Sequence, residues 1–326
     1  AERDGDTCNV ASEGITSYFG GNDNSDSSGN IKWAKVWYAG SGPRVGGEGD
    51  DLNSLTLNAV GSGSEFDYIH IHQGFDDGIE IFGGATTLKH IAVTDTQDDS
   101  FDFDAGWQGK AQYLFVQHGT VTLNDGSVVN MGNNGFESDG VKGSSSAQVS
   151  PSNPMVANVT VVTTDGNSVR DDDPSQAYKF DDQFNSSIYN ALIVKKNAVN
   201  TQCIEFSGDG EKQADNISFT SSVMACSNNF ANTDTFAGGP LAGQTKTAWF
   251  ENGGASEILT DDVSVLAANG FATNTASTDV SVTATDLSTT DSFFESVNYI
   301  GAVSDQDTTS NWYKWVEAAV AAANAD

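Results

Sequence analysis

Two neighbouring segments of the chain are near-copies of each other at a spacing of 22 residues. The shift pairs Asp76 with Asp98, Asp77 with Asp99, Ile79 with Phe101, Glu80 with Asp102 and Ile81 with Phe103. The strand-like segments before them obey the same shift, since Ile69 corresponds to Ile91. A repeat of this length built on strands is typical of a solenoid, in which each repeat forms one turn and contacts only its neighbours.

Short runs of β-branched and aromatic residues recur along the chain, near positions 70, 91, 114, 160, 191 and 217. Each ends in Gly, Asp, Asn or Ser, and no helical pattern separates them, which excludes an alternating strand–helix array. The sequence therefore predicts an all-β chain that forms a single parallel β-helix of roughly ten coils over residues 1–305, with an irregular segment at 1–30.

The C-terminal segment differs from the rest because it is rich in alanine and contains neither Gly nor Pro between Trp312 and Ala325. This composition predicts a short α-helix within residues 306–326, with Ser310 or Asn311 as its N-cap. The end of a solenoid exposes apolar core, so we expect this helix to cover the last coil, with Trp312 and Trp315 packed against it.

The chain carries 45 acidic and 14 basic residues, a net charge of −31. This balance argues against nucleic acid or an anionic membrane surface as a partner, since both require clustered Lys and Arg. It favours divalent cations or a salty medium, as for an acidic secreted protein of a marine-type organism. We expect no transmembrane segment, because no apolar run approaches the roughly 20 residues that one needs.

Three cysteines are present. Cys203 and Cys226 lie about one coil apart, so stacked coils could bring them together as a disulfide, or they could be two buried thiols. Cys8 has no evident partner, and its role stays open.

Several strands carry one acidic residue between apolar ones. Neighbours of an inward residue point outward, so Phe101 and Phe103 in the core would place Asp102 outside. The pattern predicts an external carboxylate ladder made of Glu80, Asp102, Glu137, Asp181, Glu205 and Glu251. Carboxylates about 4.8 Å apart repel by roughly 3–4 kcal/mol at an effective dielectric near 20.

Calcium would relieve this repulsion, because it takes six to eight oxygen ligands. The candidate ligands are Asp76, Asp77, Glu80, Asp98, Asp99, Asp102 and Asp104. The alternative is that the paired aspartates bond backbone amides at coil corners. A weaker candidate for calcium is the loop with Asn22, Asn24 and Asp26, which is also explained as a surface turn.

Glycoside hydrolysis would need two carboxylates, and Asp98, Asp99 and Asp102 are the candidates. The Gly-His-Gly and Arg-Ile-Lys motifs of polygalacturonases are absent. A calcium-dependent lyase would need a basic residue near the metal to take the proton, and Lys89 and Lys110 lie one strand away from the acidic repeat. Aromatic side chains outside the core could stack on a glycan, and the candidates are Trp37, Tyr38 and Trp107; the alternative is that they fill the core or pack under loops.

The segments FDDGIEIFGG, DDSFDFDAGWQGKAQYLFVQ and YIGAVSD…NWYKW occur in this order. They resemble a group of bacterial secreted or lipid-anchored proteins built as right-handed parallel β-helices of the pectin-lyase-like type. The resemblance implies a processed chain at the cell surface, in the periplasm or outside a bacterium. It supplies no catalytic residues, since members of the group mostly have no assigned function.

These observations favour a secreted or cell-surface binding or structural protein with an acidic, calcium-binding face that could also bind a glycan. One alternative is a polysaccharide lyase or glycoside hydrolase. Another is a subunit of an extracellular assembly that self-associates through solenoid ends or edges. No organic cofactor is expected.

Overall fold

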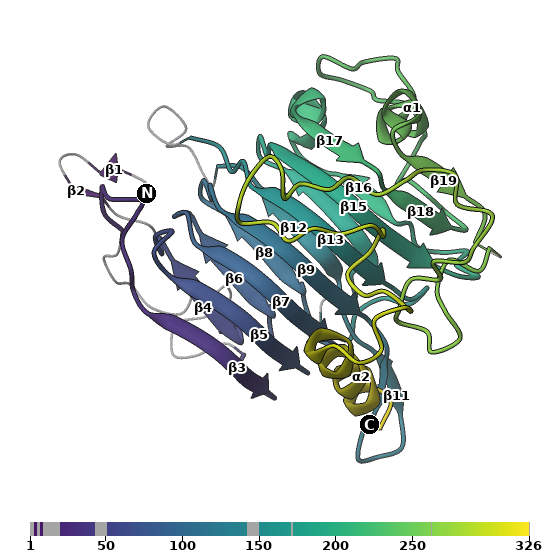
Figure 1. The fold of residues 1–326 in the computed structure, drawn as a ribbon, viewed down its shortest axis with the longest axis horizontal. Coiled ribbons are helices and arrows are strands. Elements are labelled where there is room, and N and C mark those ends of the chain that lie inside the picture. Colours follow the sequence, from purple (N-terminus) through teal and green to yellow (C-terminus); the bar gives the residue numbers. More distant parts are fainter. Residues whose placement is uncertain are drawn as a thin grey trace.

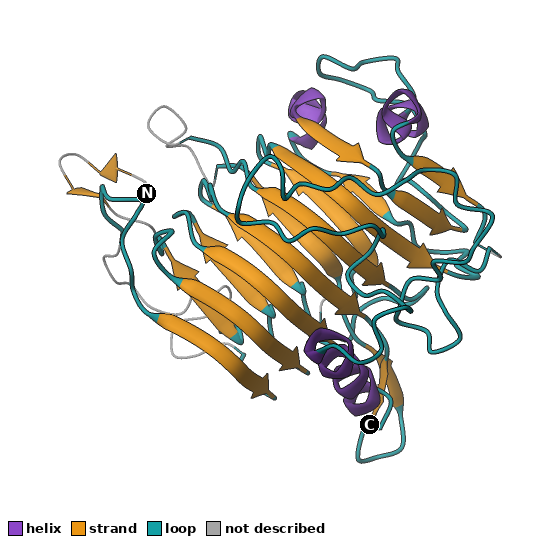
Figure 2. Cartoon of the chain, viewed as in Figure 1, coloured by secondary structure: helices purple, strands orange, loops and turns teal. Residues whose placement is uncertain are grey.

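The computed structural model describes residues 3–4, 7–8, 20–42, 51–141, 150–170, 172–261 and 263–325. The chain winds into stacked coils whose strands form two parallel sheets (Figures 1 and 2). The predicted parallel β-helix with a short C-terminal helix is therefore confirmed. No helix in the described residues is long and apolar enough to cross a membrane.

In the part of the chain that the structure describes, the larger sheet has nine strands. In spatial order they are β3 (Asn30–Trp37), β5 (Glu65–His72), β7 (Thr87–Thr94), β9 (Lys110–Gln117), β13 (Met155–Val162), β15 (Ser186–Lys195), β17 (Ile217–Thr220) with β18 (Val223–Cys226), and β19 (Glu257–Leu259). Because β17 and β18 both pair with β15, the described part of this sheet has eight levels, fewer than the ten coils expected.

The smaller sheet has six strands. They are β4 (Leu55–Asn58), β6 (Ile79–Phe82), β8 (Phe101–Asp104), β12 (Asn134–Asp139), β14 (Gln176–Asp181) and β16 (Ile204–Phe206). Its inward side chains form stacked rows, with ring centroids of Phe101 and Phe136 5.0 Å apart and those of Phe136 and Tyr178 4.8 Å apart. These rows meet the inward aliphatic rows of the larger sheet, such as Ile69 and Ile91, in one continuous core.

Each long strand of the larger sheet bends at one residue with a positive φ. The residues in this row are Trp33, Tyr68, His90, Tyr113, Asn158, Asn190 and Ser221. The bend shifts the alternation of side chains by one position, so that Phe66 and Ile69 both face the core. This shift explains why the segment around Trp33 shows no clean alternation in the sequence.

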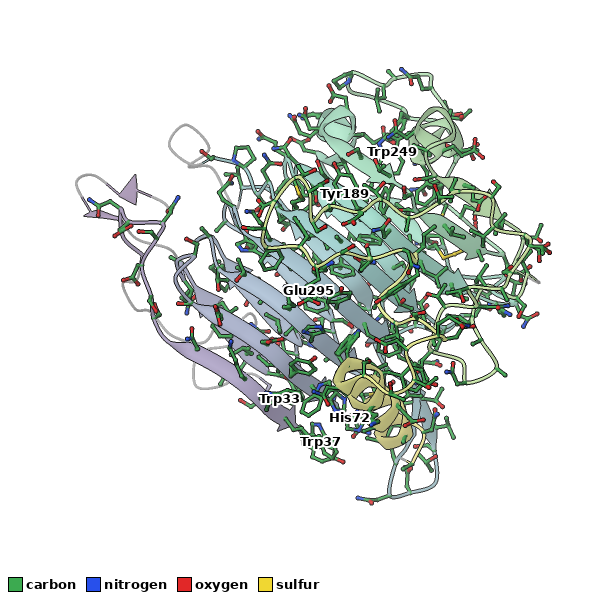
Figure 3. All side chains as sticks on the ribbon, viewed as in Figure 1. Trp33, Trp37, His72, Tyr189, Trp249 and Glu295 are labelled. Atoms are coloured by element: carbon green, nitrogen blue, oxygen red, sulfur yellow. A yellow bond between two sulfur atoms is a disulfide. The ribbon has the colours of Figure 1, made fainter. Side chains whose placement is uncertain are left out.

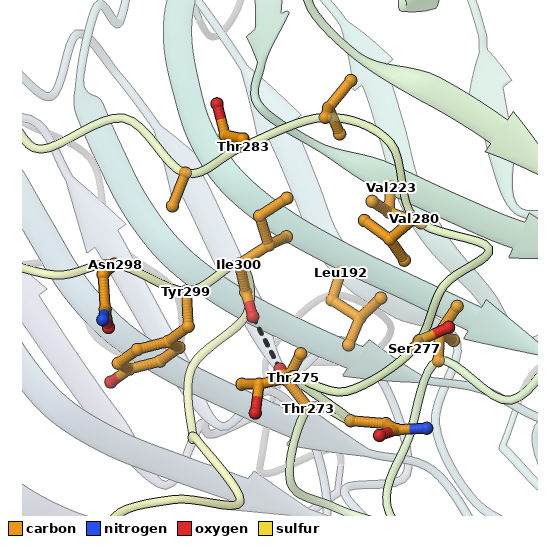
Figure 4. Close-up of a pocket in the computed structure, with 14 residues that line it drawn as sticks. Leu192, Val223, Thr273, Thr275, Ser277, Val280, Thr283, Asn298, Tyr299 and Ile300 are labelled. Carbon is orange, nitrogen blue, oxygen red and sulfur yellow. Dashed lines mark hydrogen bonds between the residues drawn. The ribbon is translucent and has the colours of Figure 1, made fainter.

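After β19 the chain runs back along the outside of the larger sheet, as Figure 1 shows in yellow. We call residues 263–305 the strap. The strap buries the outward-facing side chains Leu192, Val194 and Val223 under Val265 and Ile300. The strap and the sheet also border a cavity of about 190 Å³ (Figure 4). The last strand thus ends at Leu259, whereas we expected the β-helix to run to residue 305.

Two α-helices cover different parts of the solenoid. Helix α2 (Asn311–Ala323), capped by the Ser310 side chain, packs on the outer side of β5 and β7, among the first coils. The expectation that it covers the last coil is therefore wrong. That position is taken by α1 (Lys246–Glu251), which contacts β17 and β19. The chain can place α2 far from the last coil because the strap carries it back across the sheet.

Smaller elements complete the described fold. They are the hairpins β1–β2 (Arg3–Asp4 and Thr7–Cys8) and β10–β11 (Thr120–Thr122 and Val128–Asn130), and the 3-10 helices η1 (Gly210–Asn216) and η2 (Asn252–Gly254). Cys203 and Cys226 form a disulfide between adjacent coils. The side chain of Cys8 lies outside the described residues, as does most of the segment 1–30 before Gly20.

Candidate metal centre

The outward carboxylates of the smaller sheet stack in the expected row, except for two of its six expected members. The strand register aligns Thr56, Glu80, Asp102, Glu137, Lys179 and Glu205. The assignment of Asp181 to this row is wrong, because Lys179 occupies the position and Asp181 aligns with Asp139. Glu251 was also misplaced, since it ends helix α1.

The central carboxylates of this row are covered and not solvated. Glu80 is 1% exposed and Asp102 is 8% exposed, although both point away from the apolar core. The carboxylate row is therefore not external at its central residues, Glu80 and Asp102, although we expected it to be. Two carboxylates buried together are costly unless they are protonated or meet a cation.

Three carboxylates from two neighbouring coils converge here: Asp77 from the turn before β6, Glu80 from β6 and Asp102 from β8. Ligand oxygens of Asp77, Glu80 and Asp102 all lie within 4.8 Å of one another. The Asn53 side chain donates a hydrogen bond to Glu80 Oε2. Asp102 Oδ1 is buried and has no hydrogen-bond partner in the described structure. The cluster thus contains a buried carboxylate oxygen whose burial is costly unless it gains a proton, a cation or a hydrogen-bond donor.

The electrostatics of the cluster point the same way. Burial, and then the Glu80 and Glu137 charges, raise the pKa of Asp102 well above its usual range. Burial, and then the Asp99 charge, do the same to the pKa of Asp77. The raised pKa favours the protonated form of both groups, and a divalent ion would compete with those protons.

Part of the acidic repeat serves the backbone. Asp77 Oδ1 accepts a hydrogen bond from the Asp99 amide at 3.1 Å, and Asp99 Oδ1 accepts one from the Asn134 amide at 2.7 Å. Asn53 Oδ1 accepts from the Asp77 amide in the same way at 3.1 Å. The alternative of corner residues that bond backbone amides therefore describes one oxygen of Asp99 and one oxygen of Asp77.

A second acidic cluster surrounds a residue that the sequence reasoning missed. The Arg170 guanidinium forms ion pairs with Asp51 and Asp76, and a third with Asp98 at 3.1 Å. Oxygens of Asp76, Asp77 and Asp98 also lie within 4.8 Å of one another. Arg170 comes from the segment after β13, and no repeat spacing links it to the aspartates, so only the tertiary structure reveals it.

The remaining candidate ligands lie apart from these clusters. Asp104 is at the far end of β8, where its Oδ1 accepts from the Ala105 amide. Asn22, Asn24 and Asp26 border a separate surface cavity of about 300 Å³. Within that segment Asp26 Oδ2 accepts a hydrogen bond from Ser28 Oγ at 3.2 Å, as expected of a turn.

The aromatic candidates separate into two groups. Trp107 is fully buried, packs against Phe103 with its ring tilted and donates its Nε1–H to the Thr86 carbonyl at 3.1 Å, so its assignment as a ligand-binding residue is wrong. It fills the core as the alternative predicted. Trp37 and Tyr38 lie at the first coil, where Tyr38 is exposed and Trp37 donates to His70 Nδ1 at 3.1 Å.

The arrangement does not favour a catalytic pair at Asp98, Asp99 and Asp102. Asp99 and Asp102 are buried, and Asp98 is paired with Arg170. Lys89 and Lys110 bond Glu295 and Asp291 of the strap, on the other sheet. Burial lowers the pKa of Lys179, but Glu137 outweighs this effect and raises it overall, so this lysine stays protonated and cannot serve as a base.

Comparison with known proteins agrees with the coil architecture. A family model described as a pectate-lyase-like β-helix domain matches residues 3–200, more than half of the 326 residues. No curated protein gives a significant match, and no solved structure does. The chain belongs to the pectate-lyase-like β-helix domain family.

Proposed function

We propose that this protein is a binding or structural β-helix that holds a divalent cation, calcium, on the outer face of its smaller sheet. The ligands are Asp77, Glu80 and Asp102. The observation that carries the proposal is the convergence of three buried carboxylates, one of which has an oxygen, Asp102 Oδ1, that is buried without a hydrogen-bond partner in the described structure.

Oxygen-only ligands select a hard cation over zinc or copper. Calcium fits better than magnesium because the carboxylates come from a turn and two strands, and calcium tolerates irregular coordination with additional water ligands. The ion would cross-link adjacent coils at the place where like charges repel them. Its role would be to stabilise the solenoid and its acidic face.

We place the protein outside the cytoplasm, at a cell surface or secreted. The Cys203–Cys226 disulfide supports this, because disulfides persist in oxidising compartments. The net charge of −31 suits an environment rich in cations.

The first test measures the melting temperature in EDTA and in millimolar calcium or magnesium, with bound metal quantified by mass spectrometry. We expect calcium to raise the melting temperature; at 100 times its dissociation constant, an ion stabilises by about 2.7 kcal/mol. Glu80→Gln and Asp102→Asn should each remove this increment. Asp102→Asn should also stabilise the protein in EDTA, because it removes a buried acid.

Glu205→Gln is the matched control, since Glu205 lies on the same outward row outside the cluster and accepts from Gln176 Nε2 at 2.9 Å. It should keep the full calcium response. A wild-type protein that binds no calcium and melts at the same temperature in calcium and EDTA would refute the proposal.

A further inference from the structure

The N-terminal end of the described solenoid is open. Ile31 on β3 belongs to the same inward row as Phe66 and Leu88. Phe66 is 5% exposed and Leu88 is fully buried, whereas Ile31 is 40% exposed. The difference arises because β3 is the edge strand, and no described strand lies beyond it. Its outer backbone groups and its core-facing side chain therefore lack the neighbour that every inner coil has.

The opposite end is closed. Phe250 of α1 is fully buried, and Trp249 packs edge-on against Phe206, Phe219 and Phe236. A helix in this position prevents the next coil from continuing the stack. Head-to-tail association of copies, which would give filaments, is therefore blocked at one of its two surfaces.

A column of stacked rings ends at the open edge. The row of positive-φ residues places Trp33 on Tyr68, Tyr68 on His90 and His90 on Tyr113, with ring centroids 3.8, 4.3 and 4.7 Å apart. Trp33 is 53% exposed, so the column of rings ends in an accessible indole. Figure 3 shows Trp33 and Trp37 at this edge of the molecule, beside α2.

The strand at the open edge also carries no acidic side chain. The segment from Asn30 to Gly42 contains Lys32 and Lys35 and no acidic residue, although the net charge of the whole chain is −31. Two copies that meet at this edge would keep most of their negative charge apart. This argument favours edge-to-edge contact over any contact through the acidic sheet.

We propose that two copies of this chain associate through their β3 strands. A twofold axis normal to the larger sheet would set the two β3 strands antiparallel and keep both Trp33 side chains on the same outer side. The two ring columns would then join through Trp33, and the Ile31 side chains would be covered. Such a contact uses the same surface on both copies, so it closes as a dimer. It does not depend on the cation proposed above.

Light scattering over a concentration series tests the proposal. We expect wild-type protein to approach twice the monomer mass as concentration rises, with and without EDTA. Trp33→Glu should make the protein monomeric, because it places a charge in the ring column. Val199→Glu is the matched control: Val199 is a 79% exposed apolar residue elsewhere on the surface, and its replacement should leave the dimer intact.

Salt provides an independent measurement. Two copies with the same large net charge repel, and added salt screens that repulsion, so dimerisation should strengthen between about 0.02 and 0.3 M NaCl. Lys35→Glu should weaken the dimer most at low salt. Circular dichroism would reveal whether Trp33→Glu folds. If it does not fold, Lys35→Glu still tests the proposal, because Lys35 is an exposed side chain whose replacement should not disturb the core.

Three results would overturn the proposal. One is a strict monomer at the highest soluble concentration. Another is a dimer that Trp33→Glu and Lys35→Glu both leave unchanged. The third is tryptophan quenching by a polysaccharide while the protein stays monomeric, which would assign the exposed ring of Trp33 to a glycan instead.

Discussion

At the scale of single residues, outward orientation and exposure prove to be different properties. Asp102 points away from the core because Phe101 and Phe103 point into it, yet it is buried among other carboxylates. Burial disfavours the bare negative charge of the Asp102 carboxylate, so this group favours a bound proton or a bound cation. A solvated carboxylate would stay ionised without either.

Arg170 supplies the fixed positive charge for one of the two acidic clusters. Replacing it in Arg170→Met would leave Asp51, Asp76 and Asp98 partly buried without their cation, at a cost of about 3–5 kcal/mol near neutral pH. Calcium should restore part of this loss by occupying the vacated site. Urea denaturation with calcium or EDTA measures both effects.

The matched control for this change is Lys212→Met, because Lys212 forms a single exposed ion pair with Asp209. Exposed pairs contribute little, so its effect should stay below about 1 kcal/mol. Equal losses in the two variants would contradict the role assigned to Arg170.

At the scale of elements, the outer face of the larger sheet acts as a second hydrophobic core. The strap is fastened to the row of bent residues: Asn190 exchanges two hydrogen bonds with the Thr285 backbone, and Asn158 donates to the carbonyls of Tyr299 and Gly301. Helix α2 then packs over the aromatic part of the same row.

Trp312 is the residue that anchors α2 to the sheet. It is buried, contacts Tyr68 and His90, and donates its Nε1–H to the Ala302 carbonyl at 2.8 Å. Trp312→Ala should therefore destabilise the fold by about 3–5 kcal/mol. Lys314→Ala, on the exposed face of the same helix, should change stability by less than about 0.5 kcal/mol. Thermal unfolding separates the two, and a similar small loss in both would mean that α2 is not held in this position.

At the scale of the whole molecule, the buried acids link stability to pH. Burial, and then the charge of Glu137, raise the pKa of Asp139 to about 8. Since an unfolded aspartate has a pKa near 4, the folded state retains protons between about pH 4 and 8 that the unfolded state has released. Stability in EDTA should therefore fall as pH rises through this window.

Melting temperatures from pH 5 to 8 measure this effect. Asp139→Asn should flatten the decline in EDTA and raise stability at pH 8 by several kcal/mol, since each pKa unit corresponds to about 1.4 kcal/mol. Added calcium should oppose the decline, because ionised carboxylates bind it better. Acids with a lowered pKa, such as Asp23 and Asp291, affect stability only at lower pH. A melting temperature that rises with pH in EDTA would contradict the assigned pKa shifts.

The sequence by itself determined the coil architecture. The pairing of Glu80 with Asp102 and of Ile69 with Ile91 across 22 residues holds in the strand register, because stacked coils turn a fixed spacing into spatial contact. The C-terminal helix and its Ser310 cap were readable for a similar reason, since both depend on interactions a few residues apart.

Only the tertiary structure decided where α2 packs, what neutralises Asp76 and which acids are buried. Arg170 reaches Asp76 from 94 residues away, and α2 reaches β5 from the far end of the chain. The loops between coils differ in length, and as a result Lys179 lies beside Glu137 in the strand register, where we had expected Asp181. The physical reason is that the repeat fixes neighbours along the solenoid, whereas contacts across its outer faces depend on chain paths that no local spacing encodes.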